Sequence, residues 1–168
     1  MGLFDFLKKA PTAPEAITFP AVLGAVANGK FVAQEELPDE IFSTGVLGPC
    51  CGVDPSEGKI YAPLSGKITQ LADTLHAVGI EAGGIEILIH VGMDTVDMNG
   101  DGFTAKVKNG QIVNKGELLL CVDLDKVRKA GHPTVAVVVV TNADDFANVE
   151  AVGSGSVSAG DPILKVSK

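Results

Sequence analysis

The 168-residue sequence contains no tryptophan, one tyrosine and only 5% aromatic residues in total. It has three cysteines, of which Cys50 and Cys51 are adjacent and Cys121 lies far off, a pattern that does not form a disulfide framework. No apolar run approaches the roughly 18–20 residues that cross a bilayer. Residues 1–10 also lack the apolar core of a signal peptide. We therefore expect a cytoplasmic protein with reduced, non-catalytic cysteines.

Positive charge is also scarce. The chain has 13 Lys and Arg against 21 Asp and Glu, a formal net charge of −8 with neutral histidines. Nucleic-acid binding requires a basic footprint, so this balance argues against a nucleic-acid partner. A hydrophobic content of 46% is enough to form a core and argues against a disordered chain. The length fits one domain with a short tail.

The chain begins with a segment that differs from the rest. Residues 1–15 are expected to be a flexible N-terminal tail and Pro/Ala linker, and residues 16–168 the folded domain. The first ten residues, MGLFDFLKKA, combine Leu and Phe with two lysines, which suits a peripheral membrane contact. A helix of ten residues is marginal in water, so a frayed end fits the same segment equally well.

The remaining sequence predicts short strands joined by tight turns. Its many glycines and prolines separate short segments rich in Val and Ile. ILIHVGM and VAVVVVT are expected strands, the second buried on both faces, and LDKVRKAG is an expected short helix that ends at Gly131. Two segments, FPAVLGAVANGKFV and IYAPLSGKITQL, show a similar pattern of short apolar stretches separated by glycine or proline, which suggests an internal duplication. The expected fold is all-β, a β-sandwich or barrel-like duplicated hybrid motif with one or two short helical turns.

His90 lies in the segment with the clearest strand pattern. Alternation puts Ile85, Ile87 and Ile89 on one apolar face, which is expected to be core, and puts Leu88 and His90 on the other. A histidine in that position is within reach of a partner and partly desolvated. A structural histidine with its hydrogen bonds satisfied is the alternative interpretation.

A second histidine precedes this strand. If residues 73–80 are also extended, Thr74, His76 and Val78 share a face, and the Thr74 hydroxyl reaches the His76 imidazole and fixes its tautomer. A hairpin connection at 81–83 would then bring His76 close to His90. Two histidines on polar faces are weak evidence for a shared functional site when taken alone.

Three segments resemble a known family. GIEILIHVGMDTV, residues 84–96, resembles the phosphorylation-site signature of the glucose-type enzyme IIA of the bacterial phosphotransferase system. TLHAVGIE, residues 74–81, is similar to the second histidine segment of that family, and MNGDGF, residues 98–103, to its Gly-acidic-Gly-Phe turn. The resemblance spans essentially the whole chain. It implies a β-sandwich in which a histidine phosphocarrier protein phosphorylates His90 at Nε2, and an enzyme IIB cysteine of an IIB/IIC sugar permease takes the group.

The resemblance also implies roles for the surrounding residues. His76 stabilises the transferring phosphoryl group and Thr74 orients His76. A backbone carbonyl near Gly92 is expected to hold the other ring nitrogen of His90. An apolar and acidic rim excludes water and docks the partners. The rim residues implied are Val78, Leu88, Asp94 and Val96.

Other classes of function fit less well. His90-Val-Gly-Met-Asp94 has the H-x-G-x-D spacing of some zinc endopeptidases, but the chain has only three histidines and no H-x-H pair, while a catalytic zinc usually takes three protein ligands. No cofactor is expected to be required. A zinc ion held by His76, His90 and a partner is a hypothesis that unchanged partner binding in a chelator would contradict. A regulatory module that binds target proteins through the same surface is a further alternative, since phosphorylation adds roughly −1.5 to −2 charge.

Overall fold

The structure is a computed structural model that describes residues 16–168. Three sheets of antiparallel strands form its framework, so the expected all-β class is confirmed. The predicted tail of residues 1–15 and its membrane contact through residues 1–10 lie outside the described residues. Every helix within 16–168 is too short or too polar to span a bilayer.

The largest sheet has eight strands in the order β13-β2-β3-β11-β7-β6-β5-β9. In chain order its strands are β2 (Gly29–Val32), β3 (Cys50–Pro55), β5 (Gly66–Leu71), β6 (Ala77–Ala82), β7 (Ile85–Val91), β9 (Ile112–Val113), β11 (Ala136–Val140) and β13 (Ser156–Val157). The neighbouring strands β11, β7 and β6 lie at its centre.

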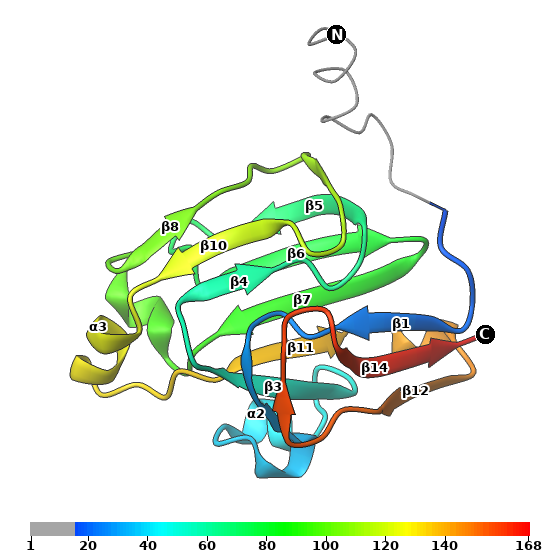
Figure 1. Ribbon diagram of the computed structural model, residues 1–168, viewed down its shortest axis with the longest axis horizontal. Helices are drawn as coiled ribbons and strands as arrows, with labels where there is room; N and C mark the ends of the chain where they lie inside the picture. Colours follow the sequence, from blue (N-terminus) through cyan, green and yellow to red (C-terminus); the bar gives the residue numbers. More distant parts are fainter. Residues whose placement is uncertain (1–15) are drawn as a thin grey trace, which may run out of the picture.

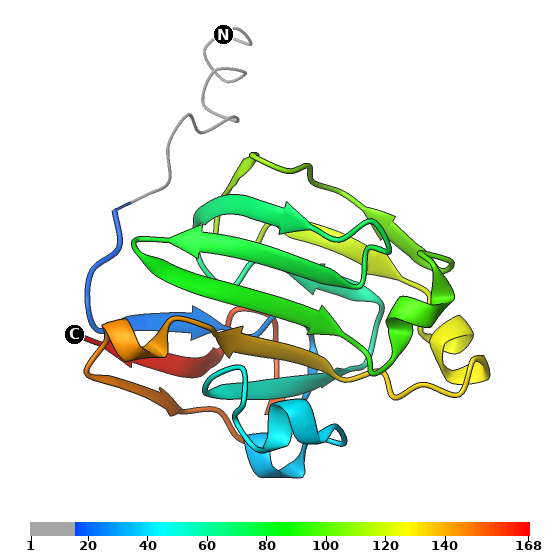
Figure 2. The same cartoon turned by 180° about the vertical axis from the view of Figure 1, so that it is seen from behind.

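Two sheets of three strands complete the β structure, in the orders β1-β14-β12 and β4-β10-β8. Their strands are β1 (Ala21–Gly24), β4 (Lys59–Tyr61), β8 (Phe103–Ala105), β10 (Leu118–Val122), β12 (Asn148–Ala151) and β14 (Pro162–Ser167). Both small sheets lie over one face of the large sheet, while α2 (Glu40–Ser43) lies on the opposite face (Figures 1 and 2).

The helices are short. Besides α2, the described residues contain α3 (Leu124–Lys129) and the 3-10 helices η1 (Gln34–Glu36), η2 (Thr95–Met98) and η3 (Ala143–Asp145). The Asp123 carboxylate caps α3 by accepting from the Lys126 N–H at 3.1 Å, and Gly131 follows its end with φ +86°. The helix predicted from LDKVRKAG is therefore confirmed.

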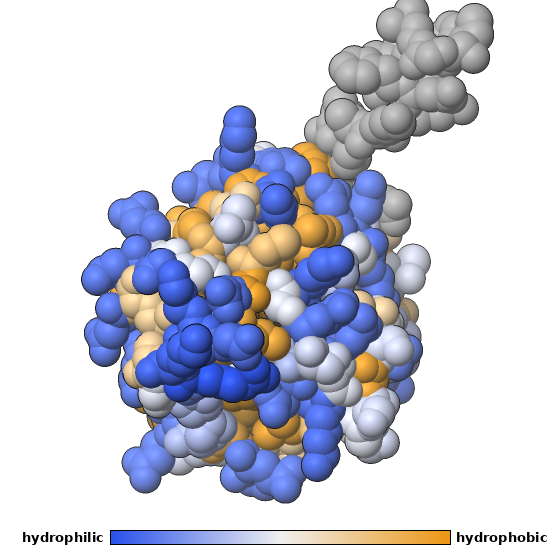
Figure 3. Space-filling view, turned by 60° about the vertical axis from the view of Figure 1, so that its left-hand side comes forward, coloured by the Kyte–Doolittle hydropathy of each residue, from blue (hydrophilic) through white to orange (hydrophobic). Residues whose placement is uncertain are grey.

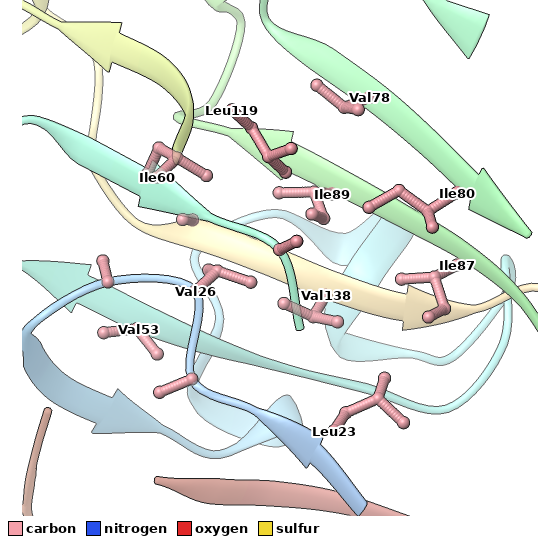
Figure 4. Close-up of a cluster of buried hydrophobic side chains, with 14 of the residues drawn as sticks. Leu23, Val26, Val53, Ile60, Val78, Ile80, Ile87, Ile89, Leu119 and Val138 are labelled. Atoms are coloured by element: carbon pink, nitrogen blue, oxygen red, sulfur yellow. The ribbon is translucent and has the colours of Figure 1, made fainter. Parts of the chain in front are cut away.

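The main core fills the space between the large sheet and the two small ones. Branched aliphatic side chains from all three sheets meet there (Figure 4). Leu23 and Leu119 from the small sheets and Ile80 and Ile89 from the large sheet are at most 1% exposed. On the opposite face a second apolar cluster, which includes Phe42, covers part of the large sheet.

Strand β11 is buried on both faces, as its apolar sequence predicts. Val138 and Val140 belong to the main core, and Val137 and Val139 to the second cluster. The central position of β11 between β3 and β7 explains why its sequence shows no polar alternation.

A two-residue turn joins β6 to β7. Gly83 and Gly84 have φ of +58° and +88°, as a tight hairpin turn requires at both central positions. The predicted hairpin is confirmed, but its turn lies at residues 83 and 84 and not at 81–83, because Glu81 and Ala82 still pair with β7. Its register pairs Ala77 with His90.

We expect Ile89→Ala to lower the free energy of unfolding by about 3 kcal/mol, since it opens a cavity in the main core. Ile89 is fully buried. Ile41→Ala is the matched control, because Ile41 is 53% exposed and its truncation should change stability by no more than about 0.5 kcal/mol. Urea unfolding of the two variants checks this, and equal losses would contradict the assigned core.

Candidate functional site

His90 lies on the face of β7 that points away from the main core. Ile87 and Ile89 are core residues, and Leu88 and His90, between and after them, are half-buried on the other face. The Nδ1 atom of His90 lies 3.0 Å from the carbonyl oxygen of Gly92. A carbonyl can only accept a hydrogen bond, so Nδ1 carries the proton of the neutral ring and Nε2 keeps its lone pair.

His76 lies beside His90 at the end of the turn between β5 and β6. The ring centroids of the two histidines are 5.0 Å apart in an edge-to-face arrangement. The Thr74 hydroxyl is hydrogen-bonded to Nδ1 of His76, the contact expected from the sequence. The backbone also holds the pair together, because the Val91 N–H donates to the His76 carbonyl at 2.8 Å.

The extended conformation expected for residues 73–80 is correct only from Ala77 onward. Residues 73–76 form a turn, and Leu75 adopts the left-handed region with φ +60°. Strand β6 begins at Ala77. Thr74 and His76 precede it, so the alternation of side chains along a strand does not determine which face they occupy. The turn itself brings both side chains to the outer face.

A segment from a distant part of the sequence forms another wall of the site. The ring centroid of Phe42 in α2 lies 5.1 Å from that of His90, and Phe42 is 4% exposed. Asp39 caps α2 by accepting from the Ile41 N–H at 2.9 Å. One further contact ties the segment to the sheet, because Gln34 Oε1 accepts from the Cys50 N–H at 3.0 Å.

The surroundings of both imidazoles disfavour their charged forms. Burial lowers the pKa of His76 below its ordinary value. Burial is also the main cause that lowers the pKa of His90, and positive charge on His76 lowers it further. The hydrogen bond to Gly92 and the carboxylates of Asp39 and Asp94 act in the opposite direction without reversing the shift. A neutral imidazole offers a lone pair near pH 7.

These shifts predict how stability depends on pH. In the unfolded chain the histidines have their ordinary pKa of about 6.5. As the pH falls through that value the unfolded state binds protons that folded His76 and His90 resist, so the histidines make the folded state less stable. Their contribution is restored as the pH rises, and it is constant above about pH 7.5. We expect urea unfolding between pH 7.5 and pH 5 to show a smaller loss of stability in His90→Ala than in the wild type. Parallel pH profiles would contradict the assigned shift.

The residues expected at the rim divide into two groups. Leu88 is half-buried on the same face of β7 as His90, and Asp94 and Val96 are exposed in the turn and 3-10 helix that follow this strand. Val96 is 47% exposed. Ile41 is likewise exposed, in the helix that carries Phe42.

Val78 is wrong as a rim residue. It is fully buried and belongs to the main core, where Figure 4 shows it above Ile80 and Ile89. The physical reason is the register of β6, in which Val78 and Ile80 point inward and Ala77 and Gly79 outward. The outer surface of β6 beside His90 is therefore formed by small residues.

Known proteins similar to this chain share one family. The sequence profile of the family described as phosphoenolpyruvate-dependent sugar phosphotransferase system, EIIA 1, matches residues 21–146. The chain belongs to this EIIA family. It is 43% identical over 163 residues to the PTS system glucose-specific EIIA component of Halalkalibacterium halodurans, covering 96% of this chain and 94% of that one.

Two further comparisons place this EIIA among fused and solved relatives. It is 37% identical over 174 residues to the PTS system β-glucoside-specific EIIBCA component of Dickeya chrysanthemi, covering 94% of this chain but only 28% of that protein. The solved glucose permease IIA from Mycoplasma capricolum superimposes with a TM-score of 0.78 at 33% identity, covering 86% of this chain and 94% of that one. The chain is thus a phosphotransferase component with the fold of a glucose-type IIA.

The sequence did not reveal that Phe42 and Asp39 of this EIIA belong to the site. Phe42 and His90 are 48 positions apart in the sequence, and no local pattern relates them. The available signal was the Asp-Glu-Ile-Phe segment after Pro38, because an aspartate in that position caps a helix. It predicts the short helix but not the strand on which the helix packs.

Cys50 and Cys51 of this EIIA are poor nucleophiles. Cys50 and Cys51 are buried and free, and burial raises the pKa of the Cys50 thiol to about 11. Burial, followed by the neighbouring Cys50, raises the pKa of Cys51 even more. The Cys50 Sγ–H donates to the Phe42 carbonyl at 3.3 Å, which is a structural contact.

His76 and His90 do not by themselves complete a metal site, since a catalytic zinc usually takes three protein ligands. Across residues 16–168 no group of three or more His, Cys, Asp or Glu side chains is arranged to hold a metal ion. The Nδ1 atoms of His76 and His90 are both engaged in hydrogen bonds, to the Thr74 hydroxyl and the Gly92 carbonyl.

Proposed function

We propose that this EIIA carries a phosphoryl group on Nε2 of His90. It accepts the group from the phosphohistidine of the histidine phosphocarrier protein and donates it to a cysteine thiolate of an enzyme IIB domain. The observation that carries this proposal is the hydrogen bond from Nδ1 of His90 to the Gly92 carbonyl, because it leaves Nε2 as the nucleophile. We assign the function to the domain of residues 16–168.

Each transfer is a displacement at phosphorus. In the first, the Nε2 lone pair of His90 forms a bond to phosphorus while the phosphorus–nitrogen bond of the donor breaks and its electron pair stays on the donor imidazole. The Nδ1 proton remains on His90, held by the Gly92 carbonyl. The phosphorylated ring is therefore cationic and a good leaving group. In the second transfer the thiolate attacks phosphorus and the electron pair returns to Nε2 of His90.

His76 stabilises charge on the phosphoryl oxygens. When the Thr74 hydroxyl donates to Nδ1 of His76, the neutral ring carries its proton on Nε2. That Nε2–H is the group that donates to a phosphoryl oxygen during transfer. Phosphoryl transfer depends mainly on alignment and charge stabilisation, which this pair of imidazoles supplies.

The surroundings of His90 suit protein partners of complementary charge. Leu88, Val96 and Ile41 offer apolar contacts and Asp39 and Asp94 offer carboxylates near the histidine. A partner with basic residues around its own reactive group would be steered to such a surface. The β-glucoside-specific EIIBCA relative carries its A part together with B and C parts, which supports IIB and IIC as partners. We place the reaction in the cytoplasm.

A phosphotransfer assay tests the proposal. The protein is incubated with phosphoenolpyruvate, enzyme I and the phosphocarrier protein, and the site of acid-labile, alkali-stable phosphate is mapped. We expect one phosphate per chain, on His90. Absence of incorporation, with a control EIIA phosphorylated by the same partners, would overturn the carrier function and leave the regulatory binding module as the better interpretation.

A further inference from the structure

The turn that follows β7 contains a buried threonine without a role so far. Thr95 is fully buried, and among the described residues only Ser65 and Thr134 are other polar residues with comparable burial. Its hydroxyl donates to the Val91 carbonyl at 2.6 Å. Ladder pairing of β7 with β6 ends at His90, opposite Ala77, so the Val91 carbonyl lies just past the end of that pairing. The Thr95 hydroxyl supplies its partner there.

The methyl group of Thr95 packs close to Gly92 and leaves no room for a larger residue there. Gly92 has φ +77°, and a Cβ at this position would collide with the Thr95 methyl and closely approach the Pro133 carbonyl. The backbone of the turn is held from the other side, because the Gly92 N–H donates to the Val135 carbonyl at 2.8 Å. The peptide between Val91 and Gly92 is thus held by Thr95 through its carbonyl and by Val135 through its N–H.

The consequence concerns the proton on His90. The Gly92 carbonyl is the acceptor for Nδ1 of His90. It belongs to the Gly92–Met93 peptide, whose N–H donates to the Pro133 carbonyl at 3.2 Å, and this peptide directly follows the Val91–Gly92 peptide that Thr95 holds. The same turn contains Asp94, which adopts the left-handed region with φ +59° and whose side chain makes no capping hydrogen bond to η2. A left-handed non-glycine residue is held in place by its surroundings.

We propose that Thr95 is a positioning residue that sets the tautomer of His90 through the Val91–Gly92 backbone. It acts by directing the Gly92 carbonyl at Nδ1, so that the neutral imidazole keeps its proton there and presents the Nε2 lone pair. The role in transfer rests on the proposed function of His90, but the tautomer itself does not.

Thr95→Val tests this inference, because valine keeps both branches of the side chain and removes only the hydroxyl. Nitrogen-15 NMR of the imidazoles measures the tautomer. We expect wild-type His90 to be protonated at Nδ1, and Thr95→Val to raise the population protonated at Nε2 and to slow phosphate acceptance about tenfold, as loss of an orienting partner does at other sites. Thr95→Ser, which retains the hydroxyl, should restore both. Thr95→Ala, which adds no atoms, gives the same readout if the valine variant does not fold.

Ser65→Ala is the matched control. Ser65 is 5% exposed and its hydroxyl accepts from the Lys115 N–H at 2.8 Å, in the connection between β4 and β5. Loss of this hydroxyl removes a buried hydrogen bond without touching the turn at 91–95. The tautomer of His90 and the rate of phosphate acceptance should therefore stay at wild-type values. An unchanged tautomer in Thr95→Val and Thr95→Ala, or an equal change in Ser65→Ala, would overturn the proposal. A wild-type protein with the Nδ1–H tautomer that takes no phosphate would instead refute only the carrier function.

Discussion

His90→Ala is expected to abolish phosphate incorporation, because it removes the one nucleophile whose lone pair the site directs outward. No other side chain in the contact network around His90 can replace it. The Nδ1 atom of His76 is engaged by Thr74, and the Cys50 thiol is buried with a pKa raised to about 11, so it is almost wholly protonated near pH 7. Incorporation from phosphoenolpyruvate through enzyme I and the phosphocarrier protein measures the effect.

The chain offers a matched control for this prediction. His132 is the third histidine, in the loop after α3, and His132→Ala should accept phosphate as the wild type does. Circular dichroism establishes that both variants are folded. Phosphate found on His76 in the His90→Ala protein would show that the assignment of the nucleophile is wrong, and equal losses in His90→Ala and His132→Ala would point to a general defect.

Strands with strict alternation of apolar and polar residues could be predicted from the sequence. The outward position of His90 followed from the alternation in β7. Ile87 and Ile89 on one face of β7 and His90 on the other are a direct result of the period-two geometry of a strand. The uniformly apolar β11 was predicted for the related reason that both its faces are buried. The contact between Thr74 and His76 was also predictable, since a single residue separates them in the sequence.

Long-range packing and irregular backbone could not be predicted in the same way. Phe42 reaches His90 only because α2 folds over the outer face of the large sheet. The burial of Val78 depends on where β6 begins, and the left-handed Leu75 shifts that start to Ala77. A one-residue shift in the start of a strand decides which side chains face inward.

His76→Gln is expected to separate acceptance from donation. The variant should accept phosphate on His90 nearly as the wild type does, because a neutral imidazole attacks and His90 keeps its hydrogen bond to Gly92. Donation to IIB should slow by about 100-fold, the usual cost of removing one donor to a developing anion. The difference arises because a thiolate adds its negative charge to that of the phosphoryl group, so the second transfer depends more on the Nε2–H of His76. Single-turnover transfer from purified phospho-EIIA to IIB measures this step.

A second readout distinguishes this role from a structural one. Positive charge on His76 lowers the pKa of His90, so His76→Gln should move the titration of His90, followed by NMR, upward toward its ordinary value. Thr74→Val should leave that charge in place and slow donation to a smaller degree, because it removes only the hydroxyl that orients His76. If His76→Gln and His90→Ala lost acceptance equally, the two imidazoles would not have the separate tasks assigned to them. The two rings, whose centroids are 5.0 Å apart, would then act together as one acceptor site.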